Sequence, residues 1–172
     1  MIEFIVPKEH YIKSYWEAFD TIAKEKIYLA ATEAFPLEST IEFIVSATEK
    51  NVPILFVIDM VINRCVGWCD AMPKTDKIGY LGTGLLPEYR EQGIGKQLIG
   101  KVINLSRDYG YQQIELDVRS SNKRAIHVYE KLGFQIASIV QEDFEFMGNI
   151  VDEPVVQMQL NLSNNNTHSH PW

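Results

Sequence analysis

A strand that contains glycines and runs through a short turn into a helix constrains this chain more than any other feature. The strand-like run 78–86 contains three glycines, and glycine inside a strand often marks a bulge or the close approach of a ligand or another backbone. Pro87 ends this run. Apolar residues at steps of three and four then predict a helix over 94–109, which stops at Gly110. The centre of the chain is therefore predicted to be a strand, a turn and a helix.

Segments on both sides of this unit alternate between helix-like and strand-like patterns. Helical spacing is found in 12–27, 37–50 and 122–132, and strand-like runs are found in 2–6, 53–59, 64–71, 114–118, 135–146 and 151–162. The order predicts a mixed α/β (α+β) fold, β-α-α-β-β-β-α-β-α-β-β, whose last two strands form an antiparallel pair with a turn at 147–149. We expect one domain over 1–162 and a polar, disordered tail over 163–172.

The composition is that of a globular chain. It has 172 residues, of which 46% are apolar and 23% charged, so disorder, collagen and coiled coil are excluded and no disulfide or structural metal is needed. Cys65 and Cys69 would lie about 13 Å apart along one strand, beyond disulfide reach, so we expect them to be reduced and to fill space in the core. Because no apolar run is long enough to span a bilayer and the chain begins without a basic leader, we expect a cytoplasmic protein with no membrane partner.

The formal net charge is −7, from 16 basic and 23 acidic residues. This charge repels the phosphates of nucleic acids, which we therefore exclude as partners. An acidic surface suits a cationic substrate such as an amine, although solubility alone is the more frequent reason for it.

The turn before the central helix has the features of an anion site. Helix N-termini present unpaired amides and the positive end of the helix dipole, and Gly93 and Gly95 leave this backbone open to a phosphate. Arg90 and Lys96 add positive charge. The segment matches neither GxxxxGK followed by Ser or Thr nor GxGxxG, so a simple nucleotide-binding loop is not indicated. A capped turn without a ligand is an equal alternative.

A second stretch of interest is the predicted helix over 122–132. Asn122 and Tyr129 lie within about 20° of one face of such a helix and about 10 Å apart along it, so both can contact one extended ligand. Each also has a structural explanation. Asn122 suits the cap of the helix, and Tyr129 suits a core aromatic, which is the more frequent case.

The two stretches together resemble the GCN5-related N-acetyltransferase (GNAT) family. The family pattern Arg/Gln-x-x-Gly-x-Gly/Ala is met by Arg90, Gly93 and Gly95. The later pattern of Asn-x-x-Ala, Tyr and Leu-Gly-Phe is met by Asn122, Ala125, Tyr129, Leu132, Gly133 and Phe134. The predicted element order fits the family from 2 to 162. The resemblance implies a sheet whose fourth and fifth strands splay apart.

By this resemblance, acetyl-coenzyme A is the acyl donor and no metal takes part. Its pyrophosphate would lie on the amides of 92–96, and its pantetheine arm would enter between the splayed strands. The residues that the resemblance assigns to the donor are Leu85, Leu86, Arg90, Gln92, Gly93, Ile94, Gly95, Lys96, Asn122, Ala125 and Tyr129. Tyr129 would stay protonated near neutral pH and suits the general acid that protonates the departing thiolate, while direct transfer to a neutral amine needs no enzyme nucleophile.

The general base is open between two aspartates. The run 78–86 lacks the glutamate that family members often place there. Asp117 in the following strand and Asp70 in the preceding one are the candidates, although a solvated or ion-paired carboxylate is the more frequent situation for each. A relay through water without a single base is the third alternative.

In the family the acceptor pocket is formed by the connection of the first two helices and by the last hairpin. Here we assign Glu33, Phe35 and Phe144 to it. Both stretches are acidic, through Glu33, Glu38, Glu142, Asp143, Glu145 and Asp152. This charge favours a cationic acceptor, although carboxylates in loops are as often simply solvated.

The sequence thus predicts an N-acetyltransferase for a primary amine, either a small cationic metabolite or drug or a peptide amino terminus. Two alternatives are kept, a coenzyme A-binding regulatory domain without activity and a transferase of a longer acyl group. Homodimers are frequent in the family, but nothing in the sequence specifies an interface.

Overall fold

The computed structural model describes residues 1–141, 144–146 and 148–163. The expected tail therefore lies outside the described residues from 164 onward, and so do Glu142 and Asp143 of the acidic stretch. Ser163, the first residue of the expected tail, is described, and its N–H donates to Asn161 Oδ1 at 2.8 Å.

The predicted alternation of helices and strands is confirmed. The helices are α1 (Glu9–Lys24), α2 (Leu37–Glu49), the short 3-10 helix η1 (Pro87–Tyr89), α3 (Ile94–Tyr109) and α4 (Lys123–Lys131). The strands are β1 (Ile2–Ile5), β2 (Ile54–Asp59), β3 (Arg64–Pro73), β4 (Ile78–Leu85), β5 (Gln113–Arg119), β6 (Gln135–Val140), β7 (Phe144–Phe146), β8 (Asn149–Val151) and β9 (Val155–Asn161). None of the helices in the described ranges is long and apolar enough to cross a membrane.

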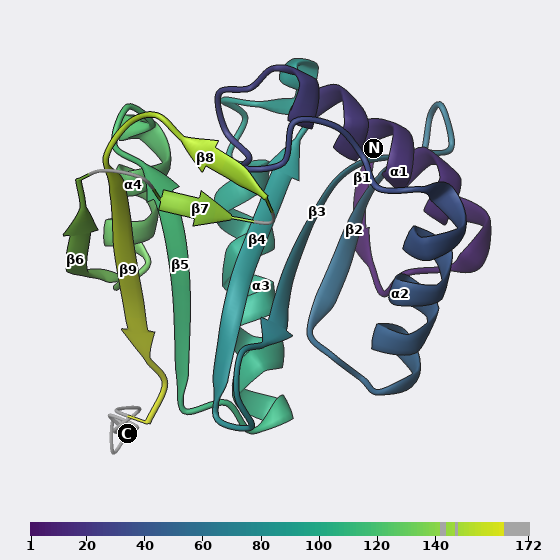
Figure 1. Cartoon of the computed structure of the whole chain (residues 1–172). Coiled ribbons are helices and arrows are strands. Elements are labelled where there is room, and N and C mark those ends of the chain that lie inside the picture. Colours follow the sequence, from purple (N-terminus) through teal and green to yellow (C-terminus); the bar gives the residue numbers. More distant parts are fainter. Residues whose placement is uncertain (142–143, 147, 164–172) are drawn as a thin grey trace.

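Seven of the described strands form one mixed sheet in the order β1-β2-β3-β4-β5-β9-β6, and β7 and β8 form a small separate hairpin (Figure 1). β4 and β5 are the parallel neighbours in this sheet. Among the described residues they pair only over 78–80 and 113–115, whereas β4 stays in register with β3 from Gly79 to Leu85. The two central strands therefore diverge toward their C-terminal ends, and the predicted splay is confirmed.

Different helices cover the two faces of the sheet. On one face α1 and α2 bury Ile12, Ile22 and Ile44 against β2 and β3. On the other face α3 and α4 bury Leu98 and Tyr129 against β3, β4, β5 and β9. In Figure 1 these two helical layers lie on opposite sides of the strands. Because each face is buried by its own layer, the opening between β4 and β5 can be reached by side chains from both layers.

A β-bulge between β2 and β3 separates the two cysteines. The register shifts between Val57 and Ile58, and residues four apart on a regular strand would otherwise share a face. Cys65 consequently belongs to the core under α1 and α2, whereas Cys69 belongs to the core under α3. Both thiols are free and buried, which confirms the sequence-based expectation.

Two sequence-based boundaries are wrong. α1 ends before Ile27, because Lys26 takes a left-handed conformation with φ 56° that a helix does not continue. Ile27, which the helical spacing placed on the buried face, is 52% exposed. The predicted antiparallel pairing of the last two runs is confirmed, since β6 pairs with β9. The bounds of the runs 135–146 and 151–162 are wrong, because residues 144–146 and 149–151 form the separate hairpin β7–β8.

Candidate active site

The segment between β4 and α3 has the backbone of an anion site. Glu91 and Gly93 have φ values of 62° and 80°, and closely spaced left-handed residues produce concave runs of N–H groups. Gly93 adopts this conformation without the penalty that a Cβ brings. A Cβ on Gly95 would meet only Leu85 Cδ1, at 3.7 Å, and none of the described side chains caps α3. The first amides of α3 are therefore left without an intrahelical partner and open to a ligand.

The polar side chains of this loop have different surroundings. Lys96 is exposed on the first turn of α3, where its charge adds to the helix dipole. The Gln92 amide donates to the carbonyl of Glu88 at 2.8 Å, which stabilises the turn itself. An exposed ion pair between Glu91 and Arg124 connects the loop to the start of α4. Of these predicted donor residues, Lys96 is thus the one whose cationic group faces solvent.

Arg90, predicted to add charge for the pyrophosphate, is engaged by protein groups. Its Nε donates to the carbonyl of Leu85 at 2.9 Å. Its two terminal nitrogens donate to the two carboxylate oxygens of Glu25, at 3.1 and 3.0 Å. The guanidinium carbon also lies 4.5 Å from the centroid of the Tyr28 ring. The positive charge of Arg90 is therefore compensated within the protein.

The free edge of β4 is defined by its hydrogen bonds to β3. The N–H of Leu86 donates to the carbonyl of Val66, and its carbonyl accepts from the N–H of Tyr89. Leu86 was predicted to bind coenzyme A, but both of its backbone groups are thus already hydrogen-bonded within the protein. Adjacent residues of a strand direct their N–H groups to opposite edges. The N–H of Leu85 consequently points toward the splay, where an extended ligand can be paired.

α4 places three of the predicted donor residues at the far side of the splay. Asn122 caps the helix, and its Oδ1 accepts from the N–H of Ala125 at 3.2 Å. This leaves the side-chain NH₂ group of Asn122 for a ligand. Tyr129 is 8% exposed and its ring packs edge-on against Phe134 with centroids 5.6 Å apart. The core interpretation of this aromatic is thus correct, and it does not conflict with a role for the hydroxyl.

The Tyr129 hydroxyl lies near the opening between the strands. Burial and the neighbouring Cys69 raise the pKa of Tyr129, so the phenol stays protonated at neutral pH. An electrostatic contribution from Tyr129 also raises the pKa of Tyr80 in β4, so Tyr129 lies within electrostatic range of that strand. The Tyr129 hydroxyl makes no hydrogen bond to any of the described residues. It therefore remains a free donor beside the splay.

Asp70 is a partly buried carboxyl at the centre of the sheet. It pairs with Gly82 in β4, and a Cβ on Gly82 would lie 3.5 Å from Asp70 Oδ1. The carboxyl thus lies over a backbone that has no side chain to cover it. Burial raises the pKa of Asp70 to about 7, while hydrogen bonds from Trp68 and the backbone of Gly82 act in the opposite direction. A carboxyl with this pKa changes its protonation state near neutral pH.

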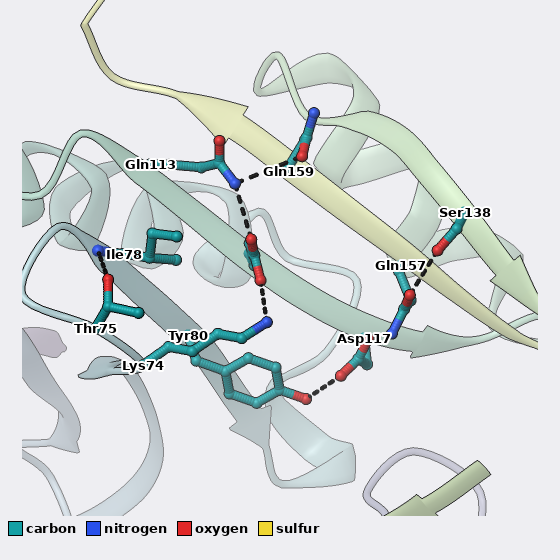
Figure 2. A network of polar contacts seen from close by, with 10 residues as sticks. Lys74, Thr75, Ile78, Tyr80, Gln113, Asp117, Ser138, Gln157 and Gln159 are labelled. Carbon is teal, nitrogen blue, oxygen red and sulfur yellow. Dashed lines mark hydrogen bonds and ion pairs between the residues drawn. The ribbon is translucent and has the colours of Figure 1, made fainter.

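Asp117 lies on the opposite side of the splay and is held by Tyr80. The Tyr80 hydroxyl donates to Asp117 Oδ2 at 2.6 Å, a contact that joins β4 to β5 after their backbone pairing has ended (Figure 2). Burial and this hydrogen bond raise the pKa of Tyr80. On the same open face an ion pair joins Lys74 to Glu115. Asp117 is thus a hydrogen-bonded carboxylate at the edge of the splay.

The predicted acceptor residues are only partly assembled. Glu33 is exposed, and Phe35 is 43% exposed with its ring 6.3 Å from that of Phe19. The side chain of Phe144 lies outside the described part of the chain. Arg119 at the end of β5 joins the α1–α2 connection to the segment after β8, since it donates to the carbonyl of Leu29 at 3.1 Å and lies 3.7 Å from the Glu153 carboxylate.

Sequence reasoning missed Tyr80, Glu25 and Arg119. Tyr80 fits the strand pattern of β4, and no residue near it in the sequence indicates that its hydroxyl has a role in the site. Glu25 contacts Arg90 across 65 positions of sequence, so no motif connects them. Arg119 lies two residues after Asp117 on the same strand, but its contact with Leu29 spans 90 positions. Each role depends on the tertiary fold rather than on spacing.

Within the described ranges no cluster of three or more His, Cys, Asp or Glu residues is arranged to hold a metal ion.

Comparison with known proteins agrees with this geometry. The model of the acetyltransferase (GNAT) family matches residues 12–134. This segment includes the anion-binding turn, both aspartates and Tyr129. The chain therefore belongs to the acetyltransferase (GNAT) family.

Particular relatives share shorter segments. A [ribosomal protein bS18]-alanine N-acetyltransferase of Haemophilus influenzae is 35% identical over 77 residues, which are 45% of this chain and 52% of the relative. A thialysine N-epsilon-acetyltransferase of Bos taurus is 49% identical over 49 residues, or 28% of this chain and 29% of the relative. The chain thus matches about half or less of the length of these curated relatives.

The fold extends further than the sequence identity. A GNAT superfamily phosphinothricin acetyltransferase from Sinorhizobium meliloti, in complex with acetyl-coenzyme A, superposes with a TM-score of 0.81 at 15% identity. The alignment covers 93% of this chain and 88% of the other. At this identity the comparison confirms the fold.

Proposed function

We propose that the protein is an N-acetyltransferase that moves the acetyl group of acetyl-coenzyme A to a primary amine. The observation that carries the proposal is the opening between β4 and β5. Its wide end lies toward the uncapped N-terminus of α3. The Asp70 carboxyl lies over Gly82 of β4, and Tyr129 is buried on the face of the sheet that α3 and α4 cover. The two relatives named above acetylate alanine and thialysine amino groups by their names, and the structural neighbour binds acetyl-coenzyme A.

Donor binding is proposed to use mainly backbone. The diphosphate would accept hydrogen bonds from the amides of 92–96, with Lys96 as the nearby cation. The amide-rich pantetheine arm would pair with the N–H of Leu85 and with the side-chain NH₂ of Asn122, beside Ala125. Gly93 and Gly95 fit a diphosphate because neither residue has a Cβ to keep the ligand from the backbone.

The chemistry is a direct transfer in which one C–N bond forms and the thioester C–S bond breaks. The incoming ammonium must lose a proton before its nitrogen can attack, and we assign this proton to Asp70, directly or through one water. The nitrogen loses a second proton to solvent as the C–S bond breaks. The departing thiolate accepts a hydrogen bond and then a proton from Tyr129, which solvent later returns. Acid and base on opposite faces of the splay would keep these two proton transfers apart.

Asp70 is the stronger of the two candidate bases. Its pKa of about 7 leaves a substantial fraction ionised at neutral pH and still makes it a better proton acceptor than an ordinary carboxylate. Asp117 already accepts from Tyr80, at 2.6 Å. We therefore propose a positioning role for Asp117, in which it orients Tyr80 across the splay.

The acceptor is proposed to be a cationic amine, either a small molecule or a peptide amino terminus. Support comes from the acidic residues Glu115 and Asp117 on the open face of β5 and from the exposed Glu33 in the α1–α2 connection. The net charge of −7 adds a favourable long-range field for a cation. Two free, buried cysteines agree with a cytoplasmic location, which we propose as well.

The test is the release of coenzyme A thiol from acetyl-coenzyme A, measured with polyamines, aminoglycosides, amino acids and short peptides, after subtraction of hydrolysis. Release that depends on one class of amine supports the proposal and names the acceptor. Binding of the donor without release for any amine contradicts it and favours a regulatory domain. Faster release from propionyl- or butyryl-coenzyme A would instead identify a transferase of longer acyl groups.

A further inference from the structure

The α1–α2 connection is joined to the anion-binding turn by one side chain. Arg90 immediately precedes the left-handed residue Glu91, with which that turn begins. Its guanidinium reaches back to the end of α1, where Glu25 is the C-cap residue, and to Tyr28 in the connection. Three segments, the end of β4, the turn and the connection, therefore meet at Arg90.

The geometry of this junction is that of a strong, oriented contact. Both terminal nitrogens of Arg90 bond to the two oxygens of Glu25 in a bidentate pair, and the side chains are 24% and 20% exposed. Bidentate arginine–carboxylate pairs fix orientation as well as distance, and partial burial reduces their screening by salt. The third bond, from Nε to the Leu85 carbonyl, prevents the guanidinium from turning about its own chain. Lysine has no planar fork with which to make these contacts.

These contacts argue against a direct contact of Arg90 with a phosphate. Its charge is already balanced by a carboxylate, and three of its five N–H groups have protein acceptors. Turning the side chain toward a ligand would leave Glu25, which is only 20% exposed, without its cation. The backbone amides of the neighbouring turn can bind a diphosphate without this loss.

We propose that Arg90 is a positioning residue that transmits the ordering of the donor loop to the acceptor side. The inference rests on the proposed function, in which the diphosphate binds at 92–96, and on the assignment of Glu33 and Phe35 in the α1–α2 connection to the acceptor pocket. When a diphosphate fixes the turn, Arg90 holds Glu25 and Tyr28 in one arrangement, and the connection 26–36 becomes ordered with them. Loss of the junction then weakens acceptor binding and leaves donor binding almost unchanged.

The experiment compares Glu25→Gln with the wild type in the full chain. Glu25→Gln keeps the size of the side chain and removes the charge that holds Arg90. We expect the acceptor KM to rise about tenfold, the size of effect that charge-assisted hydrogen bonds supply, while the Kd of coenzyme A changes less than about twofold. Glu17→Gln is the matched control, because Glu17 lies on the same helix and pairs with Arg64 in an exposed contact that does not include Arg90. This control should leave both constants as in the wild type.

Hydrogen exchange with and without coenzyme A gives a readout that a general loss of stability does not imitate. In the wild type, coenzyme A should slow exchange both in 91–97 and in 26–36. In Glu25→Gln the protection of 91–97 should remain and that of 26–36 should be lost. Tyr28→Leu removes the stacked ring and keeps the ion pair, so the protection of 26–36 should be only partly lost. This variant replaces Glu25→Gln in the experiment if Glu25→Gln folds poorly.

Three results would overturn the inference. A tenfold or greater loss of coenzyme A affinity in Arg90→Gln, with an unchanged acceptor KM in Glu25→Gln, would make Arg90 a ligand of the donor. Protection of 91–97 without any protection of 26–36 in the wild type would remove the coupling and leave the proposed function intact. Absence of protection at 91–97 would contradict the proposed function itself, and the inference with it.

Discussion

Replacement of Asp70 by asparagine should lower activity and raise stability at the same time. As the general base, Asp70 contributes a factor of about a hundred or more to turnover, which is the usual size of such catalysis. Asparagine keeps the shape of the side chain but cannot accept the proton. Wild-type turnover should depend on an ionised carboxyl with a pKa of about 7, so activity should fall about tenfold from pH 8 to pH 6. In Asp70→Asn the residual activity should lack this dependence.

The stability effect follows from the same pKa. In the unfolded chain the carboxyl has a pKa near 3.8, and in the folded protein burial raises it to about 7. The folded state then binds more protons than the unfolded state between these values, so the free energy of unfolding falls as the pH rises through this window. The loss is complete above pH 7 and amounts to about 4 kcal/mol for a shift of this size, which is an upper value for a partly exposed group.

Asp70→Asn does not bear this cost, because asparagine carries no charge. Its midpoint of thermal unfolding should exceed that of the wild type at pH 8 by several degrees, since each kcal/mol corresponds to about 2 to 4 °C in a chain of this length. At pH 4 the difference should vanish. The neighbouring Tyr15 and Cys69 do not contribute to this pH dependence of stability. Burial raises the pKa of both side chains, so both stay neutral between pH 4 and pH 8.

The assay is the pH profile of coenzyme A release together with thermal unfolding at pH 4 and pH 8. Asp117→Asn is the control for the competing base and should keep the wild-type pH profile. The reasoning is refuted if Asp70→Asn retains the wild-type profile and gains no stability at pH 8.

Three further substitutions test other parts of the site. Tyr129→Phe should lower turnover about tenfold or more with little change in coenzyme A affinity, and unchanged turnover would exclude the general-acid role. Gly93→Ala places a Cβ at φ 80°, which costs about 1 to 2 kcal/mol, and should weaken donor binding measured by titration calorimetry more than it raises the acceptor KM. Gly84→Ala sets a Cβ 2.6 Å from the Trp68 ring and should lower the free energy of unfolding by about 1 to 3 kcal/mol in denaturant titrations, without altering the pH dependence of turnover.

Local patterns were enough to predict most elements of the fold. The spacing of apolar residues in α3 and its end at Gly110 are properties of neighbouring residues, and the structure has this helix over Ile94–Tyr109. The exceptions depend on a single backbone conformation or on the division of one strand-like run. Lys26 ends α1 through a positive φ that no periodicity encodes. The antiparallel pairing of β6 with β9 agrees with the predicted closing pair, whereas the hairpin β7–β8 between them was not predicted, because the strand-like pattern of 135–146 continues into β7.

The candidate site was predictable to the extent that it lies in continuous motifs. The turn of Gly93 and the position of Tyr129 on α4 follow from spacing within a dozen residues. The environment of Asp70 does not, because it requires the pairing of β3 with β4 and the absence of a side chain at Gly82. The environment of Arg90 was not predictable either. The sequence predicts that its charge binds a phosphate, whereas in the fold this charge is balanced by Glu25.

The divergence of β4 and β5 leaves two strand edges without backbone pairing in the middle of the sheet. Beyond Tyr80 and Glu115 the facing edges no longer bond to each other, and open strand edges invite pairing with other extended chains. An elongated ligand rich in amides would act here as a missing strand, so its binding energy becomes part of the folding energy. By mass action, a ligand at a hundred times its Kd adds about 2.7 kcal/mol to the free energy of unfolding. The donor's cellular concentration would then set the resistance of this protein to unfolding and aggregation as well as its rate of turnover.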